Sequence, residues 1–150
     1  TLHYLARMLK AGEDPMFIAR RMVILASEDI GNAQPTALVV ATACMQAVHM
    51  VGMPEAQIIL AQAATYLATA KKSTASYNGI MEALHDLETQ KLESIPMHLR
   101  NASNKVMKQQ GYGRDHVRYP WKEEKKGVKV NQEYMPKNLV GKKYYKPDWK

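Results

Sequence analysis

Apolar residues recur at helical spacing through the first two thirds of the chain, and glycine and proline punctuate the pattern. The pattern predicts five successive helices, over about residues 2–11, 15–30, 35–51, 54–70 and 74–90, the last with Ser73 as its cap. A sixth, short helix is predicted around residues 103–110, ending at Gly111. The first segment begins without a capping residue or an initiator Met, so we expect the chain to be part of a longer polypeptide.

The second predicted helix has the clearest ends. Asp14 can cap the free N–H groups of its first turn, and Pro15 has no N–H to lose at the first helical position. Gly31 can end the helix because a glycine turns left-handed without a Cβ clash. The sequence therefore predicts a helix that begins after Asp14 and stops at Gly31.

The charges inside that helix oppose its dipole. Arg20 and Arg21 lie near the positive end, while Glu28 and Asp29 lie in the last turn, which costs up to roughly 0.3–1 kcal/mol per charge without partners. A local rule broken in this way indicates partners in three dimensions. We interpret these four residues as a charge network that holds helices or subunits in register, with Asn32 capping the next helix or securing the turn.

Two later helices are unusually apolar. The segment 35–51 is hydrophobic almost all round, so it is expected to be buried on every side, within the domain or in a subunit interface. The segment 54–70 adds small alanines that let backbones approach closely. In the fifth helix, a set of large apolar residues is expected to face the core: Tyr77, Ile80, Met81, Leu84 and Leu87.

Composition changes after residue 95. The chain carries a net charge of +7, yet residues 1–95 hold 7 Lys/Arg and 9 Asp/Glu, while residues 96–150 hold 14 and 5. Aromatics alternate there with Lys, Gly and Pro, which predicts an extended arm, with a short β-ribbon, laid over the helical body. We therefore divide the chain into a helical domain, residues 1–110, and a basic aromatic arm, residues 111–150.

The basic excess suggests an acidic partner, either nucleic acid or an acidic protein tail, and the alternative is a solvated tail that aids solubility. Lys and Arg neutralise phosphates while aromatics stack on unpaired bases, so the interleaving suits single-stranded DNA. The candidate contacts are Arg100, Lys105, Lys108, Arg114, Arg118, Lys142 and Lys143.

The sequence contains no recognisable catalytic or cofactor-binding motif. The phosphate-binding pattern G-x-x-x-x-G-K-[ST] is missing, the five histidines show no metal-ligand spacing, and no metal site is expected. Glu28 and Asp29 point about 100° apart on a helix, so they would not converge on one atom. We expect neither catalysis nor a bound cofactor in this chain. Cys44 is expected to be a small buried hydrophobe.

Membrane insertion is not expected either. Residues 37–53, the most apolar stretch, are shorter than the ~20 residues a span needs, and polar residues interrupt them. A single cysteine excludes an internal disulfide and fits a reducing cytoplasm.

Three motifs carry a family resemblance. The first motif, from Ala19 to Pro35, reads A-R-R-(five residues)-A-S-E-D-I-G-N-A-x-P. The second begins at Ala61, reads A-Q-A-A-T-Y-L-A-T-A, and is followed by Lys72-Ser73. The third begins at His98, reads H-L-R-N-A, and is followed by Lys105, Met107-Lys108 and Gly111-Tyr-Gly113. From Leu2 to Tyr145 the chain resembles the C-terminal region of the replication-associated recombination protein A family. These are bacterial AAA+ ATPases related to clamp loaders and to the Werner-helicase-interacting ATPase. Gln34, Lys72 and Thr74 depart from the usual Asp, Pro and Asn.

The resemblance implies an all-α, collar-like oligomerisation domain of five to six helices, and a homo-oligomer that is commonly a tetramer. It places ATP and Mg on a preceding ATPase region. It further implies DNA-dependent ATP hydrolysis in replication, recombination and repair at stalled forks, with DNA, single-strand binding protein and the replisome as partners in the bacterial cytoplasm, at the nucleoid. Assembly is the leading hypothesis, with residues 15–70 forming the subunit interface. The alternative is a basic module that binds DNA or an acidic tail.

Overall fold

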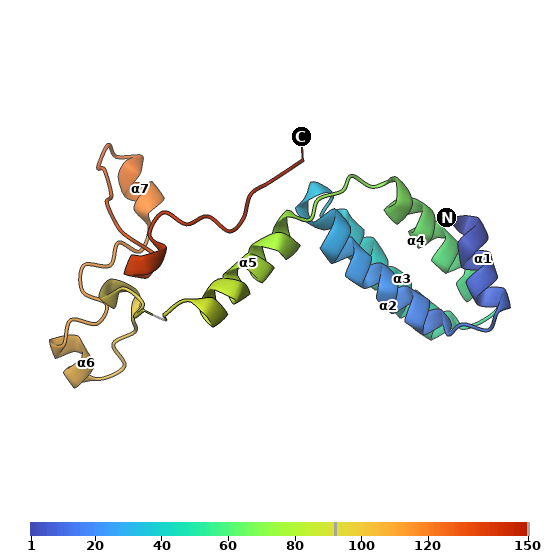
Figure 1. The fold of residues 1–150 in the computed structure, drawn as a ribbon, viewed down its shortest axis with the longest axis horizontal. Helices are drawn as coiled ribbons and strands as arrows, with labels where there is room; N and C mark the ends of the chain where they lie inside the picture. The colour runs from blue at the N-terminus through green and yellow to red at the C-terminus, as the bar shows by residue number, and fades with distance from the viewer. Residues whose placement is uncertain (92, 150) are drawn as a thin grey trace. The chain divides into compact units, whose positions relative to one another are not determined.

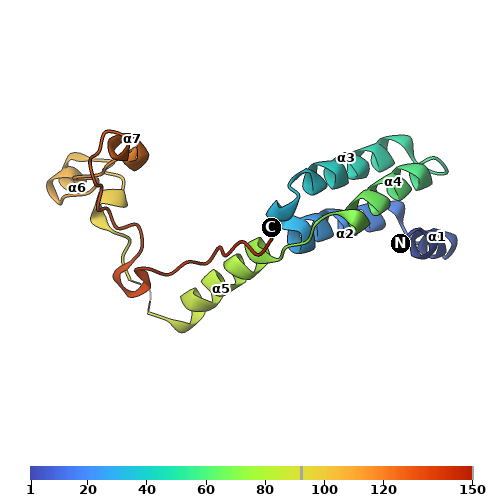
Figure 2. The same cartoon turned by 90° about the horizontal axis from the view of Figure 1, so that it is seen from above.

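The protein is all-α in a computed structural model that describes residues 1–91 and 93–149, where no strand occurs (Figures 1 and 2). Its α-helices are α1 (Leu2–Lys10), α2 (Pro15–Leu25), α3 (Thr36–Val51), α4 (Ala56–Thr69), α5 (Ala75–Thr89), α6 (Lys105–Gln109) and α7 (Pro120–Glu124). Short 3-10 turns occupy Gly31–Ala33, Met97–Leu99 and Lys137–Leu139. The predicted fold class and the succession of helices are confirmed.

The helical stretch that begins with α2 ends at Gly31, as predicted. After Leu25 the chain widens into one π-helical turn, Ala26–Ile30, and then reaches Gly31 with φ of 50°. A Cβ added to Gly31 would lie 3.2 Å from the carbonyl oxygen of Ser73. Both the left-handed backbone and the close approach therefore require glycine at this position.

The core lies among α2, α3 and α4, which pack on one another, while α1 packs on α4. Ile30 and Leu60 are the largest side chains with almost no exposed surface, and alanines fill much of the remaining interior, among them Ala19, Ala41 and Ala63. Small side chains at the contacts let the three helices approach closely, as predicted for α4. Figures 1 and 2 show these helices lying side by side.

One burial prediction, that for α5, is wrong, and the prediction for α3 loses one of its two alternatives, because α3 is not buried on every side within the single chain. Helix α3 buries one stripe, Ala37, Ala41, Cys44 and Val48, and leaves its other side exposed. Helix α5 exposes all five of the large apolar residues expected in the core. Spacing alone identifies an apolar face but not what covers it.

The contacts divide the chain into two compact units, and the division falls after Asp86 rather than at residue 110. The helical unit comprises residues 1–86 together with the final segment from Tyr144. We call residues 144–149 of this segment the strap. The basic unit comprises residues 87–143.

The basic unit is more helical than predicted. Asn104 caps α6 by accepting a hydrogen bond from the backbone N–H of Met107 at 2.8 Å. Pro120 begins the single-turn helix α7 in a stretch that the sequence indicated was too broken for helices, and no β-ribbon occurs among the described residues. Proline is compatible with the first helical position, which is why one turn could form there.

Among the described residues, no helix is both long enough and apolar enough to cross a membrane.

Candidate functional site

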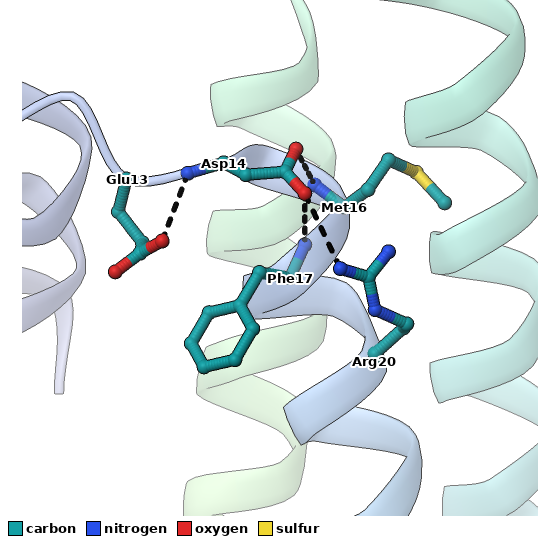
Figure 3. Close-up of polar contacts among 5 residues, drawn as sticks. All are labelled: Glu13, Asp14, Met16, Phe17 and Arg20. Carbon is teal, nitrogen blue, oxygen red and sulfur yellow. Dashed lines mark hydrogen bonds and ion pairs between the residues drawn. The ribbon is translucent and has the colours of Figure 1, made fainter.

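Arg20, a member of the predicted charge network, pairs at the start of α2 with Asp14, which that network did not include (Figure 3). The Asp14 carboxylate accepts hydrogen bonds from the backbone N–H groups of Met16 and Phe17, both at 3.0 Å. The Arg20 guanidinium lies 3.3 Å from the same carboxylate, and both side chains are 54% exposed. Asp14 is therefore the predicted cap, and its ion pair with Arg20 is screened by solvent.

The other predicted members of the network do not meet one another within the chain. Among the described residues, no ion pair joins Arg21, Glu28 or Asp29 to another side chain. Asp29 contributes through its backbone carbonyl, which accepts a hydrogen bond from the N–H of Ser73 at 2.8 Å. A role for these charges between subunits stays a prediction.

Asn32 does not cap α3, which was one of the two roles predicted for it. Its side-chain amide donates a 3.1 Å hydrogen bond to the hydroxyl of Tyr145, and α3 has no side-chain cap. The turn after Gly31 is thus secured to the strap, 113 residues further along the chain. This contact agrees with the other role predicted for Asn32, which is to secure the turn.

The strap runs alongside α5 in the opposite direction (Figures 1 and 2). The hydroxyl of Tyr144 donates to the buried Asp86 carboxylate at 2.9 Å, and Lys146 lies 3.4 Å from Glu82. At the start of α5, the Ser73 hydroxyl donates to Asp148 and accepts from the N–H of Ala75. The sequence alone does not show these contacts, because the two partners of each lie 58 or more residues apart.

A groove of about 970 Å³ lies within the basic unit. Its lining includes Arg114, Arg118, Tyr119 and Lys122, with His98 at one side. The guanidinium of Arg118 and the ammonium of Lys122 lie 5.5 and 4.6 Å from the centre of the Tyr119 ring. The groove thus combines cations with an aromatic ring, as phosphate and base recognition requires.

Carboxylates also line the groove, and two of the three are engaged locally. Glu123 pairs with Lys126 at 2.9 Å, and Glu133 accepts hydrogen bonds from the two backbone N–H groups that follow it. Asp115 is the third. Across residues 87–143 there are 13 Lys/Arg and 6 Asp/Glu, a net charge of +7, whereas the rest of the chain carries 8 of each. The whole basic excess therefore belongs to this unit.

The groove brings together Arg114 and Arg118 but not the other predicted contacts. Arg100 is held beside Tyr112, 5.5 Å from the ring centre, and its Nε donates to the Ile95 carbonyl at 2.7 Å. The remaining predicted residues do not line the groove: Lys105 and Lys108 are exposed on α6, Lys142 is half-buried and Lys143 is exposed. Tyr119 and Lys122 also line the groove and were not among the predicted contacts, although basic and aromatic residues alternate in this part of the sequence.

The pKa values of Cys44 and Tyr66 are displaced, and neither residue lines this groove. Burial raises the pKa of the Cys44 thiol above its ordinary value, which makes it a poor nucleophile. Hydrogen bonds from Thr36 and then Gln34 lower the pKa of the Tyr66 hydroxyl. Among the described residues, no group of three or more His, Cys, Asp or Glu could hold a metal ion.

The fold and its surfaces define an all-α domain with a neutral helical unit and a strongly basic one. The family model described as "MgsA AAA+ ATPase C terminal" matches residues 1–150, and the chain belongs to that family. The relatives that it matches include proteins named replication-associated recombination protein A and ATPase WRNIP1.

Individual relatives agree with this assignment. An AAA domain-containing protein from Mycobacterium tuberculosis is 49% identical over 97% of this chain and 32% of its own length. Replication-associated recombination protein A of Escherichia coli K12 is 40% identical over 97% of the chain and 32% of its length. ATPase WRNIP1 of Dictyostelium discoideum is 40% identical over 97% of the chain and 16% of its own length. The chain spans about a third of the bacterial relatives named here.

Proposed function

We propose that this chain is a self-association module that joins copies of a AAA+ ATPase into a homo-oligomer, a tetramer in the leading form of the proposal. The observation that carries the proposal is the apolar surface that α3 and α4 leave uncovered. Val39 and Ile58 are each 67% exposed and Met50 is 79% exposed, on helices that are apolar nearly all round. Large exposed apolar surface on a helical domain is typical of a protein interface.

The rest of the polypeptide would supply the chemistry. By this proposal, ATP and Mg bind outside this chain, and hydrolysis responds to DNA during replication, recombination and repair in the bacterial cytoplasm, at the nucleoid. The names of the relatives, AAA domain-containing protein and replication-associated recombination protein A, support this role. Single-strand binding protein and the replisome are the proposed partners of the whole protein, and no membrane is involved.

Light scattering of the chain across a concentration series tests the proposal. We expect a mass that is a multiple of 17.0 kDa, and a lower multiple for Val39→Glu or Ile58→Glu. A matched control, Val106→Glu on α6, changes a residue that is 59% exposed in the basic unit and should leave the mass unchanged. A wild-type chain that stays monomeric at every concentration contradicts the proposal.

A second candidate function is binding of single-stranded DNA by the basic unit. The groove that holds Arg118, Lys122 and Tyr119 together favours it, because cations bound to phosphates release counterions while the ring can stack on a base. An acidic protein tail is the competing occupant.

Oligonucleotide binding across a salt series tests this second function. Each lost phosphate contact should reduce the slope of log affinity against log salt by about 0.7. We expect that change for Arg118→Ala and for Lys122→Ala but not for the control Lys10→Ala, on α1. Binding without salt dependence, or no binding at low salt, contradicts a phosphate-driven mode.

A further inference from the structure

Helix α5 has two opposite faces, and only one of them is covered. Gly79, Glu82 and Asp86 lie at i, i+3 and i+7, and all three meet the strap. A Cβ on Gly79 would lie 3.1 Å from the carbonyl oxygen of Tyr144, so the strap backbone approaches this face closely. At about 100° per residue, these three positions lie within one arc of the helix.

The opposite arc carries a row of large apolar residues. Tyr77, Ile80, Leu84 and Leu87 follow one another at intervals of three, four and three residues, and we call them the α5 seam. Their side chains are 42%, 56%, 46% and 53% exposed. Intervals of three and four in alternation are those of the a and d positions of a coiled coil, the positions that fill the holes of a partner helix.

The positions flanking the α5 seam suit a second copy of the same helix. The e positions are Met81 and Glu88, and the g positions within the helix are Ser76 and Ala83. Like charges at e and g positions repel identical helices, and here only one of the four is charged. Hydrogen bonds to the strap hold α5 in place before any partner arrives, which reduces the entropy lost on pairing.

We propose that α5 pairs with α5 of a second copy of this chain through the α5 seam. This inference rests on the proposed self-association and names a face that the exposed surface of α3 and α4 does not include. Two helices that meet by the same face make an isologous contact, which closes on itself. A second isologous contact, at α3 and α4, would close the assembly as a tetramer of dihedral symmetry if its two-fold axis crossed the first at a right angle.

Charge insertion and crosslinking test the pairing. Light scattering should show that Leu84→Glu reduces the mass at least twofold, while Val106→Glu, at a residue of similar exposure on α6, does not. Circular dichroism should show the same helix content in both variants, because each changed residue is exposed. In a separate experiment, Ile80→Cys and Leu84→Cys chains are oxidised, first each variant alone and then the two variants mixed. Cys44, the one native cysteine, is buried and is not expected to crosslink.

The outcomes separate this inference from the proposed function. Disulfide-linked dimers of both single variants support parallel helices. Dimers of only one single variant, or of the mixture alone, support antiparallel helices, and each of these outcomes supports the pairing. An oligomeric wild type, with Leu84→Glu of unchanged mass and no crosslink, overturns the pairing and leaves self-association standing. A monomeric wild type at all concentrations overturns both.

Discussion

The hydroxyl of Tyr144 donates a 2.9 Å hydrogen bond to the carboxylate of Asp86, which is only 6% exposed. The two residues lie 58 positions apart and mark the two ends of the basic unit, which leaves the helical unit after Asp86 and returns at Tyr144. The bond therefore closes a loop of chain that contains the entire basic unit. Because a buried carboxylate needs hydrogen bonds, this contact is expected to stabilise the helical unit.

Tyr144→Phe should destabilise the chain by about 1–3 kcal/mol, since it removes a donor from a buried carboxylate. The free energy of unfolding, measured in urea by circular dichroism, checks this. Tyr134→Phe is the matched control, because Tyr134 is 49% exposed and its change should cost less than about 0.5 kcal/mol. Equal effects of the two variants would show that the Asp86 contact contributes nothing.

Gly79→Ala should lower the stability of the intact chain and raise the stability of a chain without the strap. In the intact chain the new Cβ would lie 3.1 Å from the Tyr144 carbonyl oxygen, so the strap backbone must shift, and we expect lower stability and faster trypsin cleavage after Lys143, at the start of the strap. Without residues 144–150 that contact is gone, and alanine should stabilise α5 by about 1 kcal/mol over glycine.

Thermal unfolding of four chains, intact and shortened, each with and without Gly79→Ala, measures that reversal. Ser76→Ala on the same helix is a control, because its side chain is exposed and its effect should keep the same sign in both backgrounds. A stabilising Gly79→Ala in the intact chain is the result that contradicts close packing of the strap.

Asp14→Ala should destabilise the helical unit more than Arg20→Ala does. Asp14 caps two N–H groups of α2, and losing such a cap costs about 1 kcal/mol, whereas an exposed ion pair contributes about 0–1 kcal/mol. Urea unfolding of the two single variants and the double variant gives the coupling energy. A coupling energy above about 1 kcal/mol would contradict the view that solvent screens the pair.

Local signals in the sequence were sufficient to predict the helices of the helical unit. Asp14 caps α2, Gly31 ends the following turn, and Ser73 accepts the first N–H bond of α5, each through atoms a few residues apart. Such contacts depend on residue type and short-range geometry, which a sequence displays directly. The substitution of Lys72 for the usual proline did not prevent Ser73 from capping α5.

The candidate surfaces could be predicted only in part. The spacing of Tyr77, Ile80 and Leu84 identified an apolar face, but whether that face meets the core depends on where α5 lies. Likewise Arg118 was recognisable as a basic residue, whereas its meeting with Tyr119 and Lys122 around a groove needed the folded backbone. Long-range partners such as Tyr145 for Asn32 have no local signature.

Tyr66 should ionise at lower pH than an ordinary tyrosine. Gln34 donates to its hydroxyl at 2.7 Å and Thr36 lies 2.6 Å from it, and these hydrogen bonds lower its pKa from the ordinary value of about 10. Titration followed by ultraviolet absorbance should show an early step that belongs to Tyr66. That early step should move upward in Thr36→Val and stay unchanged in Thr42→Val, a control on the same helix.

The same shift sets the sign of a stability change with pH. Because the folded chain favours the Tyr66 phenolate, its pKa in the folded state lies below the unfolded value, so the added stability is present above the unfolded pKa and is lost as pH falls through the folded one. The stability difference between wild type and Thr36→Val should therefore widen as pH rises toward 10. A difference that stays constant, measured by urea unfolding at each pH, would show that these hydrogen bonds do not favour the phenolate.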